Sequence, residues 1–202
     1  MVLNSRALMR IGAASAVALA LGGCALLSSP PTPDTFDLSA PDLVSKRTAS
    51  RGILVVQEPT AIQVVDSQRM VARSAGGEVS YVPDAQWSDR LPALFQARLI
   101  ESFENAGRLG AVARPGDSVT ADYQLLTDLR TFEIDARTSP PQARVEVAVR
   151  IISNEGGRIV AGHIFSGSAP AQGVTGPAAS ASLNEALKQV LSEIVRWTGS
   201  RV

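Results

Sequence analysis

The sequence predicts an α/β fold: a single domain in which a mixed and largely antiparallel sheet is packed by two main amphipathic helices. Apolar and polar residues alternate in consecutive segments between residues 123 and 167, which is typical of strands with one buried face. In two other segments, at residues 89–106 and 176–199, apolar residues recur every three or four positions, which is typical of amphipathic helices. No internal repeat or long heptad pattern accompanies them, so one domain is the simplest organisation.

The first half of the chain predicts short strands. Residues 36–38 are a candidate first strand, and the polar residues 39–51 are expected to be irregular. The continuous apolar run at 53–56 predicts a strand that is buried on both faces. Residues 69–73 and 78–82 flank Ser74-Ala75-Gly76-Gly77, which predicts a β-hairpin that turns at the paired glycines.

The two helices have recognisable ends. Ser88 is a candidate cap for a helix from Asp89 to Ala106, and Gly107 is placed to end it. Gly176-Pro177 marks the start of the second helix, and Gly199 marks its end. The expected buried stripe of the first helix is Leu91, Leu94, Phe95, Leu99 and Phe103, and that of the second is Leu183, Leu187, Val190, Leu191, Ile194 and Trp197.

Between the helices, a short apolar piece at 111–113 precedes three long strands. Tyr123 and Leu125 have the opposite parity to Phe132 and Ile134, so a bulge or kink is expected within 126–131. The next strand alternates cleanly, and a turn at 154–157 leads into the strand 158–167, which completes a β-meander. The inward residues of the middle strand are Ala143, Val145, Val147, Val149 and Ile151.

The N-terminus carries a lipidation signal. Arg6 and Arg10 precede a charge-free apolar run at 11–21, which is too short to span a bilayer and has the pattern of a secretory signal. The tetrad Leu-Gly-Gly-Cys at positions 21–24 ends in the only cysteine of the chain. It closely resembles the lipobox of bacterial lipoproteins. The alternative is an ordinary signal peptide with a chance cysteine.

The lipobox resemblance implies that the signal is cut before Cys24, that the sulfur carries a diacylglyceryl group, and that the new amino group carries an acyl chain such as palmitate. Ala25 stands where such proteins have aspartate for retention in the inner membrane, so the periplasmic side of the outer membrane is expected. The resulting organisation is a signal peptide at 1–23, the lipidated cysteine with a Ser/Pro-rich tether at 24–35, and a domain at 36–202.

Composition narrows the function. Removing residues 1–23 leaves 179 of 202 residues with 17 basic and 19 acidic side chains, and this net charge of −2 argues against a nucleic-acid binder. With Cys24 lipidated, no disulfide can form within one chain. Aromatic residues make up only 4%, so a core of mostly Val, Leu, Ile and Ala is expected.

The sequence indicates no catalytic set, metal or cofactor. His163 is the only histidine, lies on the parity of Ile159 and Phe165, and is expected to have a packing role rather than a functional one. The G-x-x-x-x-G spacing at 157–162 lacks the lysine and hydroxyl of a phosphate loop. Carboxylates are scattered, and solvated surface charge is their expected state: Asp84, Asp89, Asp122, Asp128, Glu133 and Asp135.

Several segments along residues 20–198 occur in an order that is informative: the lipobox, Phe36-Asp37-Leu38, residues 64–73, residues 78–81, Trp87, residues 122–125, Phe132-Glu133 and the tryptophan that ends the last helix. Together they resemble the auxiliary lipoproteins of ABC-type transport systems that accompany MCE-type lipid transporters of the Gram-negative envelope. Val65 stands where that pattern has leucine. The resemblance implies a non-enzymatic protein that docks an inner-membrane permease, an ATPase and a lipid-binding MCE protein at the outer membrane.

Four residues are candidates for partner binding: Asp66, Arg69, Tyr81 and Trp87, because arginine and aromatic side chains are favoured anchors at interfaces. The structural alternative is that Asp66 and Arg69 brace the hairpin while Tyr81 and Trp87 fill the core. Homo-oligomerisation to match a ring-shaped partner stays open. So do two other functions: a periplasmic lipid carrier that itself holds an acyl chain, and, ranked last, a lipid-anchored hydrolase, for which Lys46 and Lys188 are the only lysines.

Overall fold

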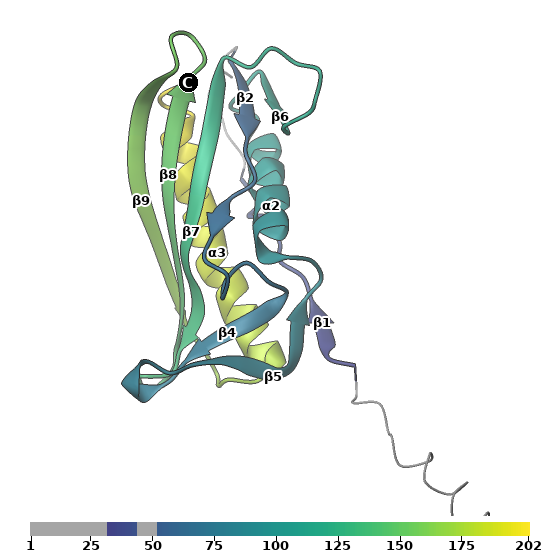
Figure 1. Ribbon diagram of the computed structural model, residues 1–202, viewed down its shortest axis with the longest axis vertical. Coiled ribbons are helices and arrows are strands. Elements are labelled where there is room, and N and C mark those ends of the chain that lie inside the picture. Colours follow the sequence, from purple (N-terminus) through teal and green to yellow (C-terminus); the bar gives the residue numbers. More distant parts are fainter. Residues whose placement is uncertain (1–31, 44–51) are drawn as a thin grey trace, which may run out of the picture. The chain divides into compact units, whose positions relative to one another are not determined.

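The computed structural model describes residues 32–43 and 52–202 (Figure 1). The expected signal peptide, Cys24 and most of the tether lie outside the described residues, so the boundaries at 23/24 and 35/36 stay predictions. The elements in chain order are β1 (Asp34–Phe36), β2 (Ile53–Val56), β3 (Thr60–Ala61), β4 (Arg69–Arg73), the 3-10 turn η2 (Ala75–Gly77), β5 (Val79–Trp87), α2 (Leu91–Ala106), β6 (Ala111–Ala113), β7 (Tyr123–Asp135), β8 (Gln142–Ser153), β9 (Arg158–Pro170) and α3 (Gly176–Thr198).

The strands of this part of the chain form one mixed sheet organised around β7. One edge of β7 pairs antiparallel with β8 along its whole length, and β8 pairs antiparallel with β9. The other edge of β7 is shared in parallel by three short strands, first β2, then β3, then β4. β6 extends the sheet from β2, whereas β5 and then β1 extend it from β4. The predicted α/β class with a mixed sheet is confirmed.

The meander contains two irregularities. The β7–β8 register shifts between Leu129 and Thr131, which confirms the predicted bulge and lets Leu129 and Phe132 both be buried. In β9 the register shifts so that Ile152 lies opposite Ile159, which leaves Val160 as the extra residue. This second bulge moves Ile159 to the opposite face from Phe165. The expectation that these two residues share a face is therefore wrong.

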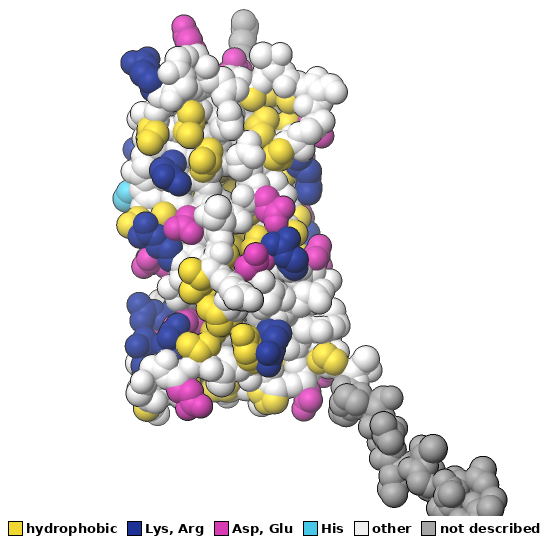
Figure 2. Space-filling view, viewed as in Figure 1, with side chains coloured by type: hydrophobic (Ala, Val, Ile, Leu, Met, Phe, Trp, Pro, Cys, Tyr) yellow, Lys and Arg dark blue, Asp and Glu magenta, His cyan; other side chains and the backbone are white. Residues whose placement is uncertain are grey.

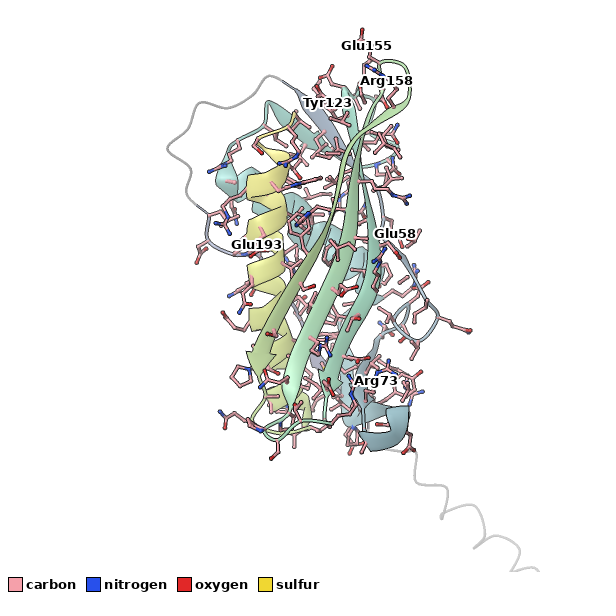
Figure 3. The ribbon with its side chains drawn as sticks, turned by 90° about the vertical axis from the view of Figure 1, so that its left-hand side faces the viewer. Glu58, Arg73, Tyr123, Glu155, Arg158 and Glu193 are labelled. Carbon is pink, nitrogen blue, oxygen red and sulfur yellow. The ribbon has the colours of Figure 1, made fainter. Side chains whose placement is uncertain are left out.

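Both helices cover the same face of the long strands. α3 packs on β8 and β9, and α2 packs on α3 (Figures 1 and 3). We call the other face of β7, β8 and β9 the outer face, and no helix of the described residues covers it. Inward residues of the strands and the helix stripes fill the core, which is mostly aliphatic as expected, with Trp87, Phe95, Phe103 and Phe132 as its largest members.

Several predicted boundaries shift. α2 begins at Leu91 rather than Asp89, and no side chain caps it; the Ser88 hydroxyl instead donates to Asp37 Oδ1 at 3.3 Å. β1 covers residues 34–36 rather than 36–38, because its pairing with β5 sets its register. Gly107 ends α2 with a φ of 57°, a left-handed conformation that favours glycine, as predicted.

Gly167 sets how closely β9 approaches α3. A Cβ atom at this position would lie 2.4 Å from the Ala186 carbonyl oxygen and 2.9 Å from Val190 Cγ2. Real Cβ atoms do not approach a backbone oxygen so closely, so the helix and the strand can pack at this distance only when the strand carries glycine here.

The variant Gly167→Ala is expected to lower the free energy of unfolding by about 1–3 kcal/mol, because the added methyl group overpacks the β9–α3 contact. Urea denaturation followed by circular dichroism measures this. Gly162→Ala is the matched control, since its Cβ would lie 3.6 Å from the Val149 oxygen, an ordinary contact. Equal losses for the two variants would contradict the assignment.

Candidate functional site

The β4–β5 hairpin carries the residues predicted for partner binding. Its strands pair antiparallel around η2, where Gly76 and Gly77 have φ values of 87° and 83°, so the predicted turn is confirmed. β5 continues beyond the predicted end at Val82 through an irregular stretch in which Asp84 has a φ of 50°. The sequence missed this continuation because Pro83 and Asp84 are typical of turns and are tolerated in strands mainly at bulges.

The hairpin brings Arg69 and Tyr81 together. The guanidinium carbon of Arg69 lies 3.4 Å from the centroid of the Tyr81 ring, a cation–π contact. Arg69 is exposed and Tyr81 is half-buried beneath it. These two side chains therefore form one surface feature, and Tyr81 is not part of the core.

Asp66 contacts the start of α2 rather than Arg69. Its Oδ1 atom accepts hydrogen bonds from Arg90 Nε at 3.0 Å and from Arg90 Nη2 at 2.5 Å. Arg90 Nη1 also donates to Glu58 Oε1 at 3.1 Å. The hydrogen bonds that Arg90 donates to Asp66 are the main reason that the pKa of Arg90 lies above its ordinary value. Asp66 thus links the segment before β4 to the first turn of α2.

Trp87 lies in the core. It is 1% exposed, and its ring packs edge-on against Phe132 at 5.8 Å between centroids. Its backbone N–H donates to the Gln68 carbonyl oxygen at 2.7 Å. Trp87 therefore holds the hairpin against β7, while Asp66, Arg69 and Tyr81 lie nearer the surface. The partner-binding role of the four residues stays a prediction.

Two buried carboxylates of β7, Glu133 and Asp135, are paired with arginines, and the sequence did not reveal these pairs. The Arg73–Glu133 pair joins the hairpin to β7. Arg73 of β4 donates from Nε to Glu133 Oε1 and from Nη2 to Glu133 Oε2, both at 2.8 Å. Asp135 accepts from Arg137 Nε and Nη2, both at 2.7 Å, and from Arg144 Nη1 at 3.2 Å. In Figure 3 Arg73 lies beside the lower ends of the long strands.

The sequence predicts that Glu133 and Asp135 are solvated surface charges, and this prediction is wrong. The two residues are buried, with 7% and 3% of their surface exposed. The side-chain hydrogen bonds from Arg137 hold the pKa of Asp135 well below its usual range, against the opposing effect of burial. Both carboxylates accept hydrogen bonds from arginine, and the lowered pKa makes Asp135 poorly suited to deliver a proton. The sequence missed these pairs because they depend on how the strands align. The β7–β8 register places Arg144 opposite Glu133, and the pattern of one strand does not show this register.

His163 is exposed, but its ring makes packing contacts of the kind that the sequence predicts. Its ring lies edge-on to Phe165 at 4.7 Å and roughly parallel to Trp197 at 6.1 Å. Within residues 32–43 and 52–202, no group of three or more His, Cys, Asp and Glu side chains could hold a metal ion. In the same part of the chain no helix has the length and apolarity to cross a membrane.

The comparison with protein families matches residues 36–195 to the family described as "ABC-type transport auxiliary lipoprotein component". The chain belongs to this family. The family resemblance in the sequence is therefore confirmed.

Two relatives illustrate the match. An uncharacterised protein of Bradyrhizobium diazoefficiens, bll6063, is 34% identical over 166 residues, which cover 81% of this chain and 44% of that protein. This auxiliary lipoprotein thus spans less than half the length of that relative. The crystal structure of XCC0632 from Xanthomonas campestris has 28% identity and a TM-score of 0.77, and the match covers 83% of this chain and 95% of that one.

A more distant structure shares the fold. The protein CT253 from Chlamydia trachomatis is 9% identical with a TM-score of 0.54, and the match covers 75% of this chain and 98% of that one. The sheet and helices are therefore kept where almost all side chains differ.

The Asp135 ion pairs predict a pH dependence. Because the pKa of Asp135 is lower in the folded than in the unfolded chain, its contribution to stability is complete above the unfolded value of about 4 and is lost as the pH falls below it. Asp135→Asn is expected to lower the free energy of unfolding by about 1–3 kcal/mol at pH 7. The difference from wild type should shrink between pH 5 and pH 2, measured by urea denaturation across this range.

Asp128→Asn is the control for this prediction. Asp128 lies on the same strand with 43% of its side chain exposed, and its pairing with Arg130 is looser, at 3.5 Å. A change within about 0.5 kcal/mol is expected. A pH-independent difference between wild type and Asp135→Asn would show that the carboxylate charge is not what stabilises the fold.

Proposed function

We propose that this auxiliary lipoprotein is a non-catalytic subunit that docks an MCE-type lipid transport system at the periplasmic face of the outer membrane. The observation that carries the proposal is the family match over residues 36–195, which associates the chain with an ABC transport system. Its partners would be an MCE-type lipid-binding protein, an inner-membrane permease and an ATPase. The protein itself would need no cofactor beyond the lipid on Cys24.

The lipid anchor would hold the domain at the membrane. The lipobox resemblance at positions 21–24 supports a lipid on Cys24, and Ala25 favours release to the outer membrane. Each buried methylene contributes about 0.8 kcal/mol to membrane binding, so several acyl chains on one residue give durable attachment. Pro30, Pro31 and Pro33 favour an extended spacer between the lipid and the domain.

The hairpin is the surface that we assign to the partner. Arg69 is exposed and stacked on Tyr81, and arginine and tyrosine are the residue types that contribute most to binding at interfaces. The Arg73–Glu133 pair and Trp87 fix the hairpin on β7, so this surface is held in place before a partner binds. A preformed surface loses less conformational entropy on binding.

The docking function is favoured over the lipid carrier because the core is packed with side chains. A groove of about 590 Å³ does lie on the outer face, but Asp128, Arg130 and Arg150 contribute to its lining. A carrier would be expected to enclose an acyl chain among mainly apolar side chains.

The anchor is tested by two substitutions. In Cys24→Ser the sulfur that would carry the diacylglyceryl group is absent, so we expect an uncut precursor and no incorporation of labelled palmitate. Ala25→Asp is expected to be lipidated but to move from the outer-membrane to the inner-membrane fraction. Normal processing of Cys24→Ser would overturn the anchor, and unchanged fractionation of Ala25→Asp would overturn the proposed location.

The docking surface is tested by crosslinking in intact cells. Arg69→Ala and Tyr81→Ala should each reduce capture of the MCE-type protein or permease about tenfold, because each removes half of the cation–π feature. Arg114→Ala, which changes an exposed arginine between β6 and β7, is the matched control and should leave capture unchanged. Undiminished capture by both hairpin variants would assign docking to another surface.

A further inference from the structure

The β9 strand forms a long free edge of the sheet. Among the described residues it pairs only with β8, and Figure 3, which faces this edge, shows no other described element in front of it. Of the 13 residues of β9, Arg158 at the first position is the only Lys, Arg, Asp or Glu, and His163 is the only other titratable residue. Natural sheets usually block such an edge with charge, proline or a covering segment, because it can pair with another strand.

The same strand exposes apolar side chains. Six large hydrophobic residues are exposed in the described part of the chain, and three belong to β9: Ile159 at 62%, Val160 at 46% and Ile164 at 48%. The space-filling view of the outer face shows hydrophobic side chains between arginines over β8 and β9 (Figure 2). β9 thus combines an open backbone with an uncovered apolar surface.

The backbone groups that face the free edge can be identified. The Ser168 N–H donates to Gln189 Oε1 of α3 at 3.4 Å, so it points away from β8. In an antiparallel pair, alternate residues direct both N–H and C=O to the same side, and the β8–β9 register is regular from Ala161 to Pro170. Gly162, Ile164 and Ser166 therefore also direct their backbone groups away from β8.

We propose that β9 pairs antiparallel with β9 of a second copy of this chain, across a twofold axis at Ile164. In this register Ile164 lies opposite the second copy's Ile164, and Gly162 lies opposite its Ser166. The free groups of the two strands then form about six hydrogen bonds. The two Ile164 side chains cover one another on the outer face, and His163 lies opposite the second copy's Phe165 on the other face.

A second copy fits this edge because the pairing sets no like charges against each other. Like charges directly opposite one another destabilise a strand pair, and residues 159–169 contain no Asp, Glu, Lys or Arg. In the proposed register His163 lies opposite Phe165 rather than opposite itself. The bulge at Val160 and the Gln189–Ser168 contact limit the regular open segment at its two ends. The edge is therefore complementary to itself over a defined length. This inference does not depend on the proposed docking function.

The oligomeric state tests the proposal directly. The full chain, extracted from membranes in detergent, is expected to have the mass of a dimer by light scattering. Ile164→Lys places two like charges at the twofold axis and should weaken dimerisation at least tenfold. Because Ile164 is half exposed, circular dichroism and urea denaturation should show an unchanged fold. Ile62→Lys, at a residue that is 60% exposed outside β9, should remain dimeric.

Cysteine crosslinking tests the register. Ile164→Cys should give a covalent dimer with a short bismaleimide, whereas Ile62→Cys should not, and the unmodified chain provides the blank for Cys24. A monomeric wild type would overturn the proposal. So would a dimer unaffected by Ile164→Lys, an assembly in which Ile164→Cys does not link to itself, or a crosslink from this position only to a different protein.

Discussion

The arrangement of the domain depends on how β7 divides its two edges. One edge is occupied by β8 over its whole length, and the other is shared among β2, β3 and β4, each through only two or three residue pairs. Short parallel contacts of this kind contribute few hydrogen bonds, so side-chain interactions must hold the short strands β2, β3 and β4 against β7. For β4 and the hairpin that it forms with β5, the Arg73–Glu133 ion pair and the packing of Trp87 on Phe132 provide this support.

The buried ion pair that supports the hairpin also supports the candidate partner-binding surface on it. The carboxylate of Glu133 is almost completely covered and is paired with Arg73 from the neighbouring strand. Losing one partner of such a pair leaves a buried charge uncompensated, which costs far more than losing an exposed pair. The exposed Arg69–Tyr81 feature therefore depends on interactions beneath it, and substitutions in the support would disturb the surface without touching it.

The sequence was sufficient where the information is local. The strand at 53–56, the turn at Gly76-Gly77, the end of α2 at Gly107 and the bulge near Arg130 follow from patterns within one segment. The sequence was insufficient where the position or burial of a residue depends on a segment that is distant in the chain. β3, the shifted β1, the burial of Glu133 and the changed face of Ile159 depend on which strand lies alongside and in which register. Ser88 shows the same limit, because Asp37 competes for the hydroxyl expected to cap α2.

The two proposed interactions use different parts of the sheet. The hairpin joins β7 on one edge, whereas β9 is separated from β7 by the full length of β8. At about 4.8 Å per strand, the free edge of β9 lies roughly 10 Å beyond β7, on the side away from the hairpin branch. Pairing through β9 would continue the sheet outward and would leave Arg69 and Tyr81 of each copy uncovered. Self-association and docking are therefore compatible in one assembly, in which two copies would present two hairpin surfaces to their partner.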